Sequence, residues 1–267
     1  MRNAIAIARK ELSIYFTTPW AWLVFTAMAF ITSFFFLAML ASFKQVQDMA
    51  RAFTWARMPP DYASYKNLTD GVVVQLWGVV LIVTLFVAPF LSMRLFSEER
   101  RQKTFELLMT TPIRPVEIVF GKYLGGLGAI SATIGITAVY PLILSTFGAS
   151  ESGSALEWST VWLGYGSLLL WGATCIALGM FMSSLTESQM LAAILTFAIL
   201  LPWMLIKGVA QGAEEPLRSV LGYISFDTQL SNLMKGVFDV KAVVFFLSII
   251  TLSLVLTHRS VESQRWT

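Results

Sequence analysis

The residues of this chain that could do chemistry are concentrated in residues 92–126. That segment, SMRLFSEERRQKTFELLMTTPIRPVEIVFGKYLGG, holds six basic and four acidic residues between long runs without charge. Residues 98–109 contain no Gly or Pro and predict a helix, whose apolar face follows Arg101 by one turn and consists of Phe105, Leu108 and Met109. A short helix with an apolar face and charged flanks can fill a groove on a partner protein. The alternative is a plain cytoplasmic loop that obeys the charge bias of membrane proteins.

Patterns for catalysis or metal binding are missing from the sequence. It has no Gly-rich phosphate loop followed by Lys and Ser or Thr, so we expect no nucleotide hydrolysis by this chain alone. His258 is the only histidine, which excludes an H-E-x-x-H zinc site, and the only cysteine, Cys175, lies in an apolar run where packing explains it. We therefore predict no catalytic residue, no metal site and no bound cofactor. A structural scaffold or an enzyme acting on lipid is the least supported alternative.

Composition predicts that membrane helices position the charged segment. The chain has 267 residues, 56% of them hydrophobic and 13% charged, and a mean hydropathy of +0.69. Soluble domains carry about 25% charged residues, and a membrane helix needs about 20 apolar ones. We therefore predict a single all-α integral membrane domain with six spans, namely residues 20–41, 72–93, 123–147, 158–183, 188–206 and 242–257.

The positions of Lys and Arg predict the orientation of these spans. Basic residues precede the first span, fill the loop between the second and third, and follow the last, so both termini and that loop are expected in the cytoplasm. Two longer loops, residues 42–71 and 207–241, then lie outside. The net charge of +3 accumulates beside apolar runs and not in a nucleic-acid patch. We expect contact with membrane lipid and none with nucleic acid.

The six predicted spans contain no Asp, Glu, Lys or Arg. A proton-coupled carrier or pump usually needs ionisable residues at membrane depth. If the chain serves transport, its energy must therefore arrive from outside the membrane, which gives the charged segment a role.

The first seventeen residues predict an amphipathic helix that lies on the cytoplasmic membrane surface. One face of this helix would consist of Ile5, Ala8, Leu12 and Tyr15, which are three or four residues apart. Its charged residues include Arg9, Lys10 and Glu11. We expect Thr18 to cap the first span and Pro19 to be its first residue. The alternative is a solvated extension of that span.

Two prolines end the predicted helix at 98–109 and lead into the third span. Pro112 and Pro115 each forbid helix continuation through the preceding turn, and Pro115 suits a first helical position. Glu117 favours the same helix start, and Lys122 is expected to extend its ammonium group to the membrane interface. Small residues at close helical spacing then predict tight helix packing: Gly121, Gly125, Gly128, Ser131 and Gly135.

Four stretches carry a family likeness: KELSIYFTTPWAWLV (10–24), MRLFSEERRQKTFELLMTTPIRPVEIVFGKYLG (93–125), GYISFDTQLSNLMKGVFDVKAVVFFLS (222–248) and THRSVESQRW (257–266). They resemble the membrane subunits of ATP-binding-cassette (ABC) transporters of the type-2 permease family. The likeness is closest to the branch of gliding-motility and nitrous-oxide-reductase-maturation permeases. In the second stretch the residues that match the family pattern are Glu98, Glu99, Arg100, Thr104, Glu106, Leu107, Leu108, Thr111, Pro112, Glu117, Ile118, Gly121 and Lys122.

Two positions in that stretch depart from the family pattern. Lys103 stands in place of the usual Gly, so we expect a less sharply bent approach to Thr104. Arg114 stands where a Ser or Thr cap is common, so Pro115 must help to set the helix start.

The resemblance implies six membrane helices, an N-terminal interfacial helix and cytoplasmic coupling helices in a bacterial inner membrane. It also implies a second permease copy or a paralogue, and two ATPase subunits on separate chains that bind ATP and Mg²⁺. Residues 98–109 would be one coupling element, and the tight turn at 183–188 the other. The implied ATPase-coupling residues are Glu98, Glu99, Arg100, Arg101, Thr104, Phe105, Glu106, Leu107, Leu108, Met109, Ser184 and Glu187.

The resemblance further implies that residues 207–241 hold short helices that dip back toward the membrane. Their expected apolar stripe is Leu230, Leu233, Met234 and Val237, and a simple solvated loop is the alternative. The implied function is ATP-driven export or translocation of a substrate. In the alternative, the same assembly does mechanical work on an extracytoplasmic partner, such as a periplasmic protein, and no substrate passes through it.

Overall fold

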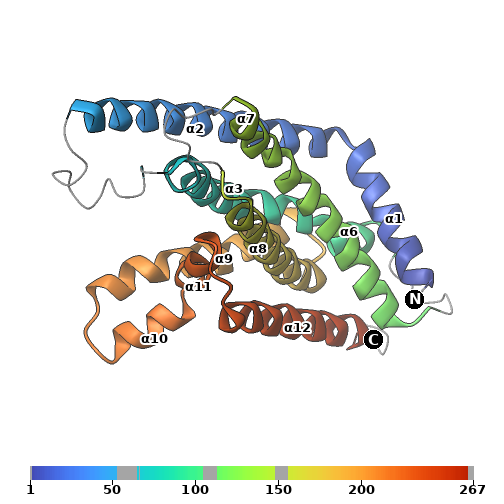
Figure 1. Ribbon diagram of the computed structural model, residues 1–267. Coiled ribbons are helices and arrows are strands. Elements are labelled where there is room, and N and C mark those ends of the chain that lie inside the picture. The colour runs from blue at the N-terminus through green and yellow to red at the C-terminus, as the bar shows by residue number, and fades with distance from the viewer. Residues whose placement is uncertain (1, 53–64, 66, 105–112, 148–155, 264–267) are drawn as a thin grey trace.

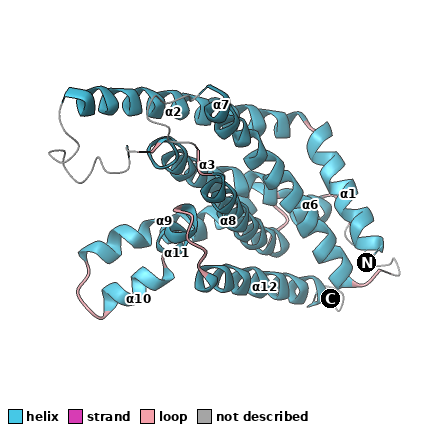
Figure 2. Cartoon of the chain, viewed as in Figure 1, coloured by secondary structure: helices cyan, strands magenta, loops and turns pink. Residues whose placement is uncertain are grey.

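The computed structural model describes residues 2–52, 65, 67–104, 113–147 and 156–263 (Figure 1). Every regular element among these residues is a helix (Figure 2). Six helical stretches are long and apolar enough to cross a membrane: Ala21–Met49, Thr69–Arg101, Pro115–Phe147, Trp158–Leu185, Gln189–Gly212 and Val240–Ser263. The prediction of an all-α protein with six membrane-spanning helices is thereby confirmed.

Four of these stretches belong to single helices and two are composite. The single helices are α2 (Pro19–Ala52), α8 (Trp158–Leu185), α9 (Gln189–Gly212) and α12 (Val240–Ser263). The second stretch joins the π-helix η3 (Thr69–Val74), α3 (Gln75–Ser92) and α4 (Arg94–Arg101). The third joins α6 (Pro115–Gly135), η4 (Ile136–Ala138) and α7 (Val139–Phe147). Outside them lie α1 (Arg2–Thr17), α10 (Leu217–Ile224) and α11 (Phe226–Met234).

Several helices continue beyond the apolar runs that predicted them. The predicted spans end at residues 41, 206 and 257, whereas α2, α9 and α12 end at Ala52, Gly212 and Ser263. Hydropathy marks the part of a helix that fits in lipid, but the hydrogen-bonded backbone continues until a helix-ending signal occurs. The 34 residues of α2 extend about 51 Å, against about 30 Å for the hydrocarbon core. Residues 42–52 are therefore helix and not part of a loop.

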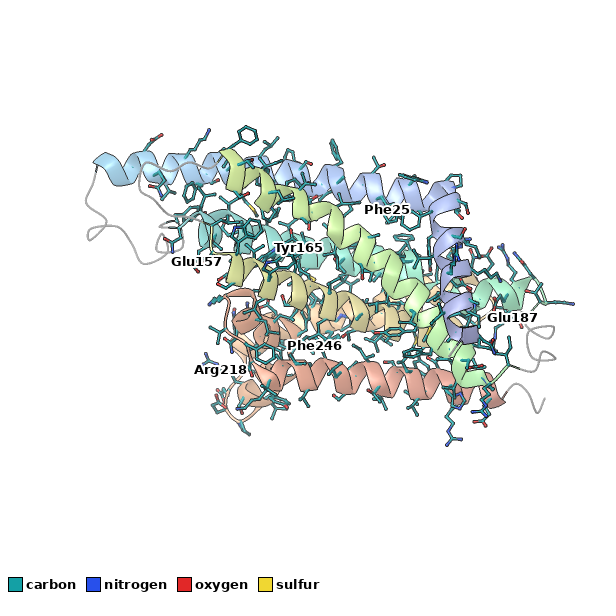
Figure 3. All side chains as sticks on the ribbon, turned by 45° about the vertical axis from the view of Figure 1, so that its right-hand side comes forward. Phe25, Glu157, Tyr165, Glu187, Arg218 and Phe246 are labelled. Carbon is teal, nitrogen blue, oxygen red and sulfur yellow. The ribbon has the colours of Figure 1, made fainter. Side chains whose placement is uncertain are left out.

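Helix α8 is the centre of the bundle. In its most apolar part 72% of the residues are buried, compared with 22% in the corresponding parts of α2 and α9. It contacts α3, α6, α9, α11 and α12, and Figure 3 shows side chains filling the space between these helices. In the middle of α8, Trp171 is fully buried and its ring stacks on Phe226 at 4.1 Å. The remaining helices are arranged around this aromatic centre.

Helices α10 and α11 turn back onto the bundle. Trp203 of α9 donates a hydrogen bond from Nε1 to the Ile224 carbonyl at 2.8 Å, and α11 contacts α8, α9 and α12. The expected apolar stripe is correct for Leu230, Leu233 and Met234, which are buried. Val237 was wrongly included, because it is 59% exposed beyond the helix end. The chain leaves the helix through Gly236 at φ 81°, a left-handed conformation that Gly adopts readily.

Candidate functional site

Several segments that are distant in sequence meet at one end of the bundle. The start of α1, the start of α6, the turn between α8 and α9, and the end of α12 all lie there (Figure 1). Ser260 of α12 donates a hydrogen bond to the Ser184 carbonyl of α8 at 3.3 Å, and Asn3 of α1 donates one to Glu117 of α6 at 3.2 Å. Figure 3 shows Glu187 at this end and Glu157 and Arg218 at the opposite one. Helix α4 runs among these segments.

The junction between α3 and α4 is held by side chains from two other helices. The helix is interrupted at Met93, four residues after Pro89. Ser183 of α8 donates to the Met93 carbonyl at 2.8 Å and accepts from the backbone amides of Phe96 and Ser97, each at 3.1 Å. These amides belong to the first turn of α4, where backbone amides have no carbonyl partner within their own helix. One hydroxyl group of α8 thus fixes the start of α4.

Tyr15 of α1 holds the same junction from the other side. Its phenol donates a hydrogen bond to the Leu91 carbonyl, just before the interruption. The ring is 4% exposed, and burial raises the pKa of the phenol above its ordinary value. Tyr15 therefore remains a neutral hydrogen-bond donor.

The helix predicted at 98–109 ends after its first turn, at Arg101, within the described residues. Helix α4 ends at Arg101, and Lys103 has φ 55° in the left-handed region. The Lys103 amide bonds the Arg100 carbonyl and the Thr104 amide bonds the Glu99 carbonyl, each at 3.0 Å, which is a Schellman helix ending. Our expectation of a less sharply bent approach to Thr104 was therefore wrong. Lys103 adopts the bend that usually favours Gly, at a cost in backbone strain.

Part of the expected coupling element lies outside the described residues. This applies to Phe105, Glu106, Leu107, Leu108, Met109, Thr111 and Pro112. On the far side, Pro115 is the first residue of α6, and Arg114 precedes it in an extended conformation without a side-chain cap. The helix start that was expected from Pro115 is the one observed.

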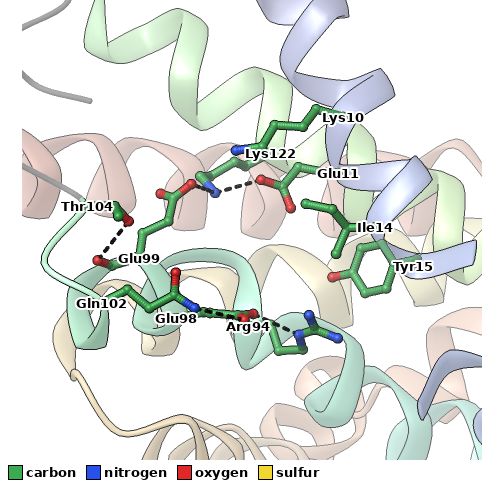
Figure 4. A pocket seen from close by; sticks show the side chains of 10 residues that line it. All are labelled: Lys10, Glu11, Ile14, Tyr15, Arg94, Glu98, Glu99, Gln102, Thr104 and Lys122. Carbon is green, nitrogen blue, oxygen red and sulfur yellow. Dashed lines mark hydrogen bonds and ion pairs between the residues drawn. The ribbon is translucent and has the colours of Figure 1, made fainter. Parts of the chain in front are cut away.

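A buried ion triad joins α1, α4 and α6. Lys122 of α6 is 2% exposed, and its Nζ donates to Glu11 Oε1 at 2.8 Å and to Glu99 Oε1 at 2.9 Å. The ammonium also lies 5.3 Å from the centre of the Phe96 ring. The expectation that Lys122 reaches the membrane interface was wrong, because two carboxylates from other helices enclose its ammonium group. Figure 4 shows the three side chains meeting.

The triad carries a net charge of −1 when all three groups are ionised. Among the described residues Glu99 Oε2 is buried without a hydrogen-bond partner. Removing one partner of a buried ion pair typically costs 3–5 kcal/mol, because the remaining charge has lost its solvation and its partner. The triad therefore makes the position of α4 depend on both α1 and α6.

The triad forms one wall of a polar cleft of about 420 Å³ (Figure 4). Three cations and three carboxylates line it, together with neutral side chains: Lys10, Glu11, Ile14, Tyr15, Arg94, Glu98, Glu99, Gln102, Thr104 and Lys122. Arg94 Nε donates to Glu98 at 2.9 Å. In the described part of the chain no group of three or more His, Cys, Asp or Glu side chains could hold a metal ion. The formal charges of the three cations and three carboxylates that line the cleft therefore cancel.

Helix α1 lies against α6 along a row of glycines. A Cβ on Gly125 would lie 2.5 Å from Glu11 Cβ, and one on Gly128 would lie 2.3 Å from Leu12. Gly121 similarly admits the Ala4 carbonyl. Close packing was predicted for these three glycines and is observed, whereas a Cβ on Gly135 would meet nothing within 4 Å.

The buried face of α1 differs from the predicted apolar stripe. Ile5 is 65% exposed, while Ala4 and Glu11 are buried and face α6. Glu11 was expected among the charged residues of an interfacial helix, as were Arg9 and Lys10, which are exposed. Thr18 also differs from expectation: its hydroxyl donates to the Ile14 carbonyl at 2.6 Å and does not cap α2, which begins at Pro19 as predicted. A position of α1 on the membrane surface stays a prediction.

The second expected coupling element lies beside the first. Helix α4 contacts both α8 and α9, and an electrostatic interaction relates Arg100 to Glu187. Ser184 is buried, and Glu187 is exposed in the turn, where Ser188 accepts a hydrogen bond from the Leu191 amide at 3.4 Å and caps α9. Arg101 and Glu187 line one open cleft. The described part of the first coupling element and the α8–α9 turn thus meet at a single surface.

Sequence reasoning missed the roles of Glu11, Tyr15 and Ser183. Glu11 and Tyr15 share a helix face with Ala4, but helical spacing places Tyr15 equally on a face with Ile5, so the sequence does not single out the buried face. Ser183 carries no sequence signal either, because its partners exist only where α3 is interrupted.

Comparison with known proteins places nearly the whole chain within one family. The family model described as "ABC-2 family transporter protein" matches residues 5–258. No curated protein matches the chain. The matched region includes the triad, the α3–α4 junction and the α8–α9 turn. The narrower branch expected from the sequence stays a prediction.

Proposed function

This chain belongs to the ABC-2 family of transporter proteins, and from that premise we propose that it is the permease subunit through which separate ATPase subunits drive transport. One observation carries the proposal: at one end of the bundle α4 is hydrogen-bonded to α6 and α8, and Lys122 of α6 links it further to Glu11 of α1. A force applied there reaches several membrane helices at once. The ATPases would supply ATP and Mg²⁺ binding, so this chain acts without catalysis or a cofactor of its own.

Helix α4 would serve as the lever of the transporter. It continues α3 across Met93, and Ser183 and Lys122 connect it to α8 and α6. Because each connection is a hydrogen bond between groups that are at least partly buried, α4 cannot shift without moving its neighbours or breaking these bonds. ATP-driven closure of the partner subunits would therefore be transmitted to α3, α6 and α8 together.

The ATPase would contact the end of α4 and the turn at 183–188. Glu187 is exposed there, close to Arg100, and residues 105–109 follow directly along the chain. Glu98 and Glu99 face the polar cleft, so they position α4 and do not reach the partner. The cytoplasm lies at this end under the proposal, with both termini, in a bacterial inner membrane.

A second permease copy would cover the least buried helices. The apolar parts of α2 and α9 are each only 22% buried, and they carry large exposed apolar side chains such as Phe30 and Met190. Lipid or a second copy must cover these faces. A dimer with two ATPase subunits supplies such a partner.

The length of α2 supports mechanical work as a second candidate function. About 20 Å of this helix exceeds the hydrocarbon thickness, and its final turns carry Lys44 and Asp48. Such a projection could contact an extracytoplasmic partner. Loss of partner capture when residues 45–52 are replaced by a Gly-Ser linker, with ATP hydrolysis preserved, would favour this candidate over substrate export.

The proposal is tested by co-expressing the full chain with the ATPase encoded beside its gene. Glu187→Arg and Phe105→Asp should each lower co-purification of the ATPase and its permease-dependent hydrolysis, because they place the wrong charge in the contact surface. Arg218→Glu is the matched control, since this exposed charge lies at the opposite end (Figure 3). Unchanged co-purification and hydrolysis in both test variants would refute the coupling surface.

A further inference from the structure

An apolar groove of about 610 Å³ lies between α2 and α3, beside the polar cleft of Figure 4. On α2 its lining includes Ala27, Met28 and Ile31, and on α3 it includes Val83, Phe86 and Phe90. These residues belong to two of the six membrane-crossing stretches. Its volume is within the range of about 300–1,000 Å³ that is common for small-molecule sites.

One end of the groove is polar. Arg94, Glu98, Arg101 and Gln189 line it there. Arg94 is paired with Glu98 at 2.9 Å, whereas Arg101 has no ion pair within the described residues. Beyond this end lies an open recess of about 420 Å³ that again includes Arg101 and Gln189, together with Glu187 and Ser188 of the α8–α9 turn. The apolar groove and this recess thus meet at the exposed guanidinium of Arg101.

We propose that this groove binds an anionic phospholipid of the surrounding bilayer, with one acyl chain between α2 and α3 and the phosphate at Arg101. An acyl chain matches the apolar lining, and a guanidinium presents paired donors that suit phosphate oxygens. Glu187 also lines the recess, where it interacts electrostatically with Arg100. Arg94 is paired with Glu98, so Arg101 is the cation offered to the headgroup.

The charged end of the groove favours a phospholipid over a helix from a second copy. Its apolar lining covers Ala21 to Ile31 on α2 and Val83 to Met93 on α3, about 15 Å along each helix. The guanidinium of Arg101 lies at one end of this length, as the headgroup lies at one end of an acyl chain. The headgroup end lies beside the surface that the proposed function assigns to the ATPase. Lipid binding itself needs no ATPase, so it can be correct or wrong independently of the proposed function.

The test uses the full chain, with any ATPase that co-purifies, in lipid nanodiscs without ATP. Phosphatidylglycerol and phosphatidylcholine that carry the same photoreactive acyl chain are incorporated at equal low fractions. Cross-linked peptides are then identified by mass spectrometry. We expect labels within residues 21–31 and 83–93, with about a five-fold higher yield for phosphatidylglycerol, since one basic residue near anionic lipid contributes about 1 kcal/mol.

Three variants sharpen the test. Arg101→Gln should lower the phosphatidylglycerol yield about five-fold, to the phosphatidylcholine level. Ala27→Trp should fill the groove and remove labelling by both lipids, whereas Phe30→Trp, at an exposed residue that does not line it, should leave labelling unchanged. Equal yields for the two lipids, or labels confined to other helices, would each overturn the proposal. Arg101→Gln decides the headgroup assignment even if Ala27→Trp does not fold.

Discussion

The hydroxyl of Ser183 accepts a hydrogen bond from the backbone amide of Phe96 at 3.1 Å, and so ties α8 to the first turn of α4. The same oxygen accepts from Ser97 and donates to Met93, so one side chain satisfies three backbone groups at the α3–α4 junction. Helix α8 is the most buried of the six apolar stretches. The junction is thus attached to the most rigidly held part of the bundle.

Ser183→Ala should destabilise the protein by about 1–3 kcal/mol, because the buried amides of Phe96 and Ser97 lose their acceptor. The only cysteine, Cys175, is fully buried, so the temperature at which a thiol-reactive fluorophore labels it reports unfolding. Ser167→Ala is the control: this buried hydroxyl donates to the Gly164 carbonyl within its own helix, and its loss should cost less. Equal shifts in the two variants would contradict the role of Ser183.

Lys122→Met should destabilise the protein by more than the small change in side-chain volume suggests. It leaves the carboxylates of Glu11 and Glu99 buried without their cation, which should cost about 3–5 kcal/mol. In the triple variant Glu11→Gln/Lys122→Met/Glu99→Gln no buried charge remains, and most of the loss should be recovered. Lys10→Met, at an exposed position on α1, serves as the control in the same labelling measurement. A triple variant less stable than Lys122→Met would contradict this account of the triad.

Gly125→Ala should displace α1 from α6. The added Cβ would lie 2.5 Å from Glu11 Cβ, and relieving such a contact in a packed interface costs about 1–3 kcal/mol. Gly135→Ala has open space around it and should be neutral or stabilising by up to about 1 kcal/mol, from helix propensity alone. Limited proteolysis between α1 and α2 should be faster only in Gly125→Ala. If both variants resist cleavage equally, α1 does not depend on the glycine row.

Lys103→Gly should stabilise the end of α4. A left-handed conformation costs a side-chain-bearing residue about 1–2 kcal/mol, and part of this gain is offset by the greater freedom of Gly in the unfolded chain. We expect a net gain of up to about 1 kcal/mol in the cysteine-labelling assay. Gln102→Gly, one residue earlier at φ −83°, should destabilise instead. Destabilisation by both substitutions would show that the left-handed ending is not formed.

The fold could be predicted from the sequence further than the site could. Apolar runs locate all six spans, because about 20 residues are enough to identify a membrane helix. The buried face of α1 could not be chosen, since Tyr15 belongs equally to a face with Ile5 and to one with Ala4 and Glu11. What decides between these faces is the glycine row of α6, more than a hundred residues away.

The remaining differences share a similar physical cause. Lys122 resembles any lysine near a span end until carboxylates from α1 and α4 are brought to it. Lys103 is unsuited to a left-handed turn by local preference, yet the Schellman hydrogen bonds at the end of α4 hold it there. Tertiary contacts thus override the local tendency of Lys122. At Lys103 the backbone hydrogen bonds that end α4 outweigh a conformational preference of about 1–2 kcal/mol.

The pairing of Glu11 with Lys122 also constrains how the chain is made, because 111 positions separate the two residues. At about 5–20 residues per second, Lys122 leaves the ribosome roughly 6–22 s after Glu11. Throughout that interval the N-terminal helix has neither its glycine row nor its cation, and Glu11 stays hydrated. The first span must therefore enter the bilayer before the helix that precedes it has a place to bind, and the N-terminus is fixed only once the third span has been synthesised.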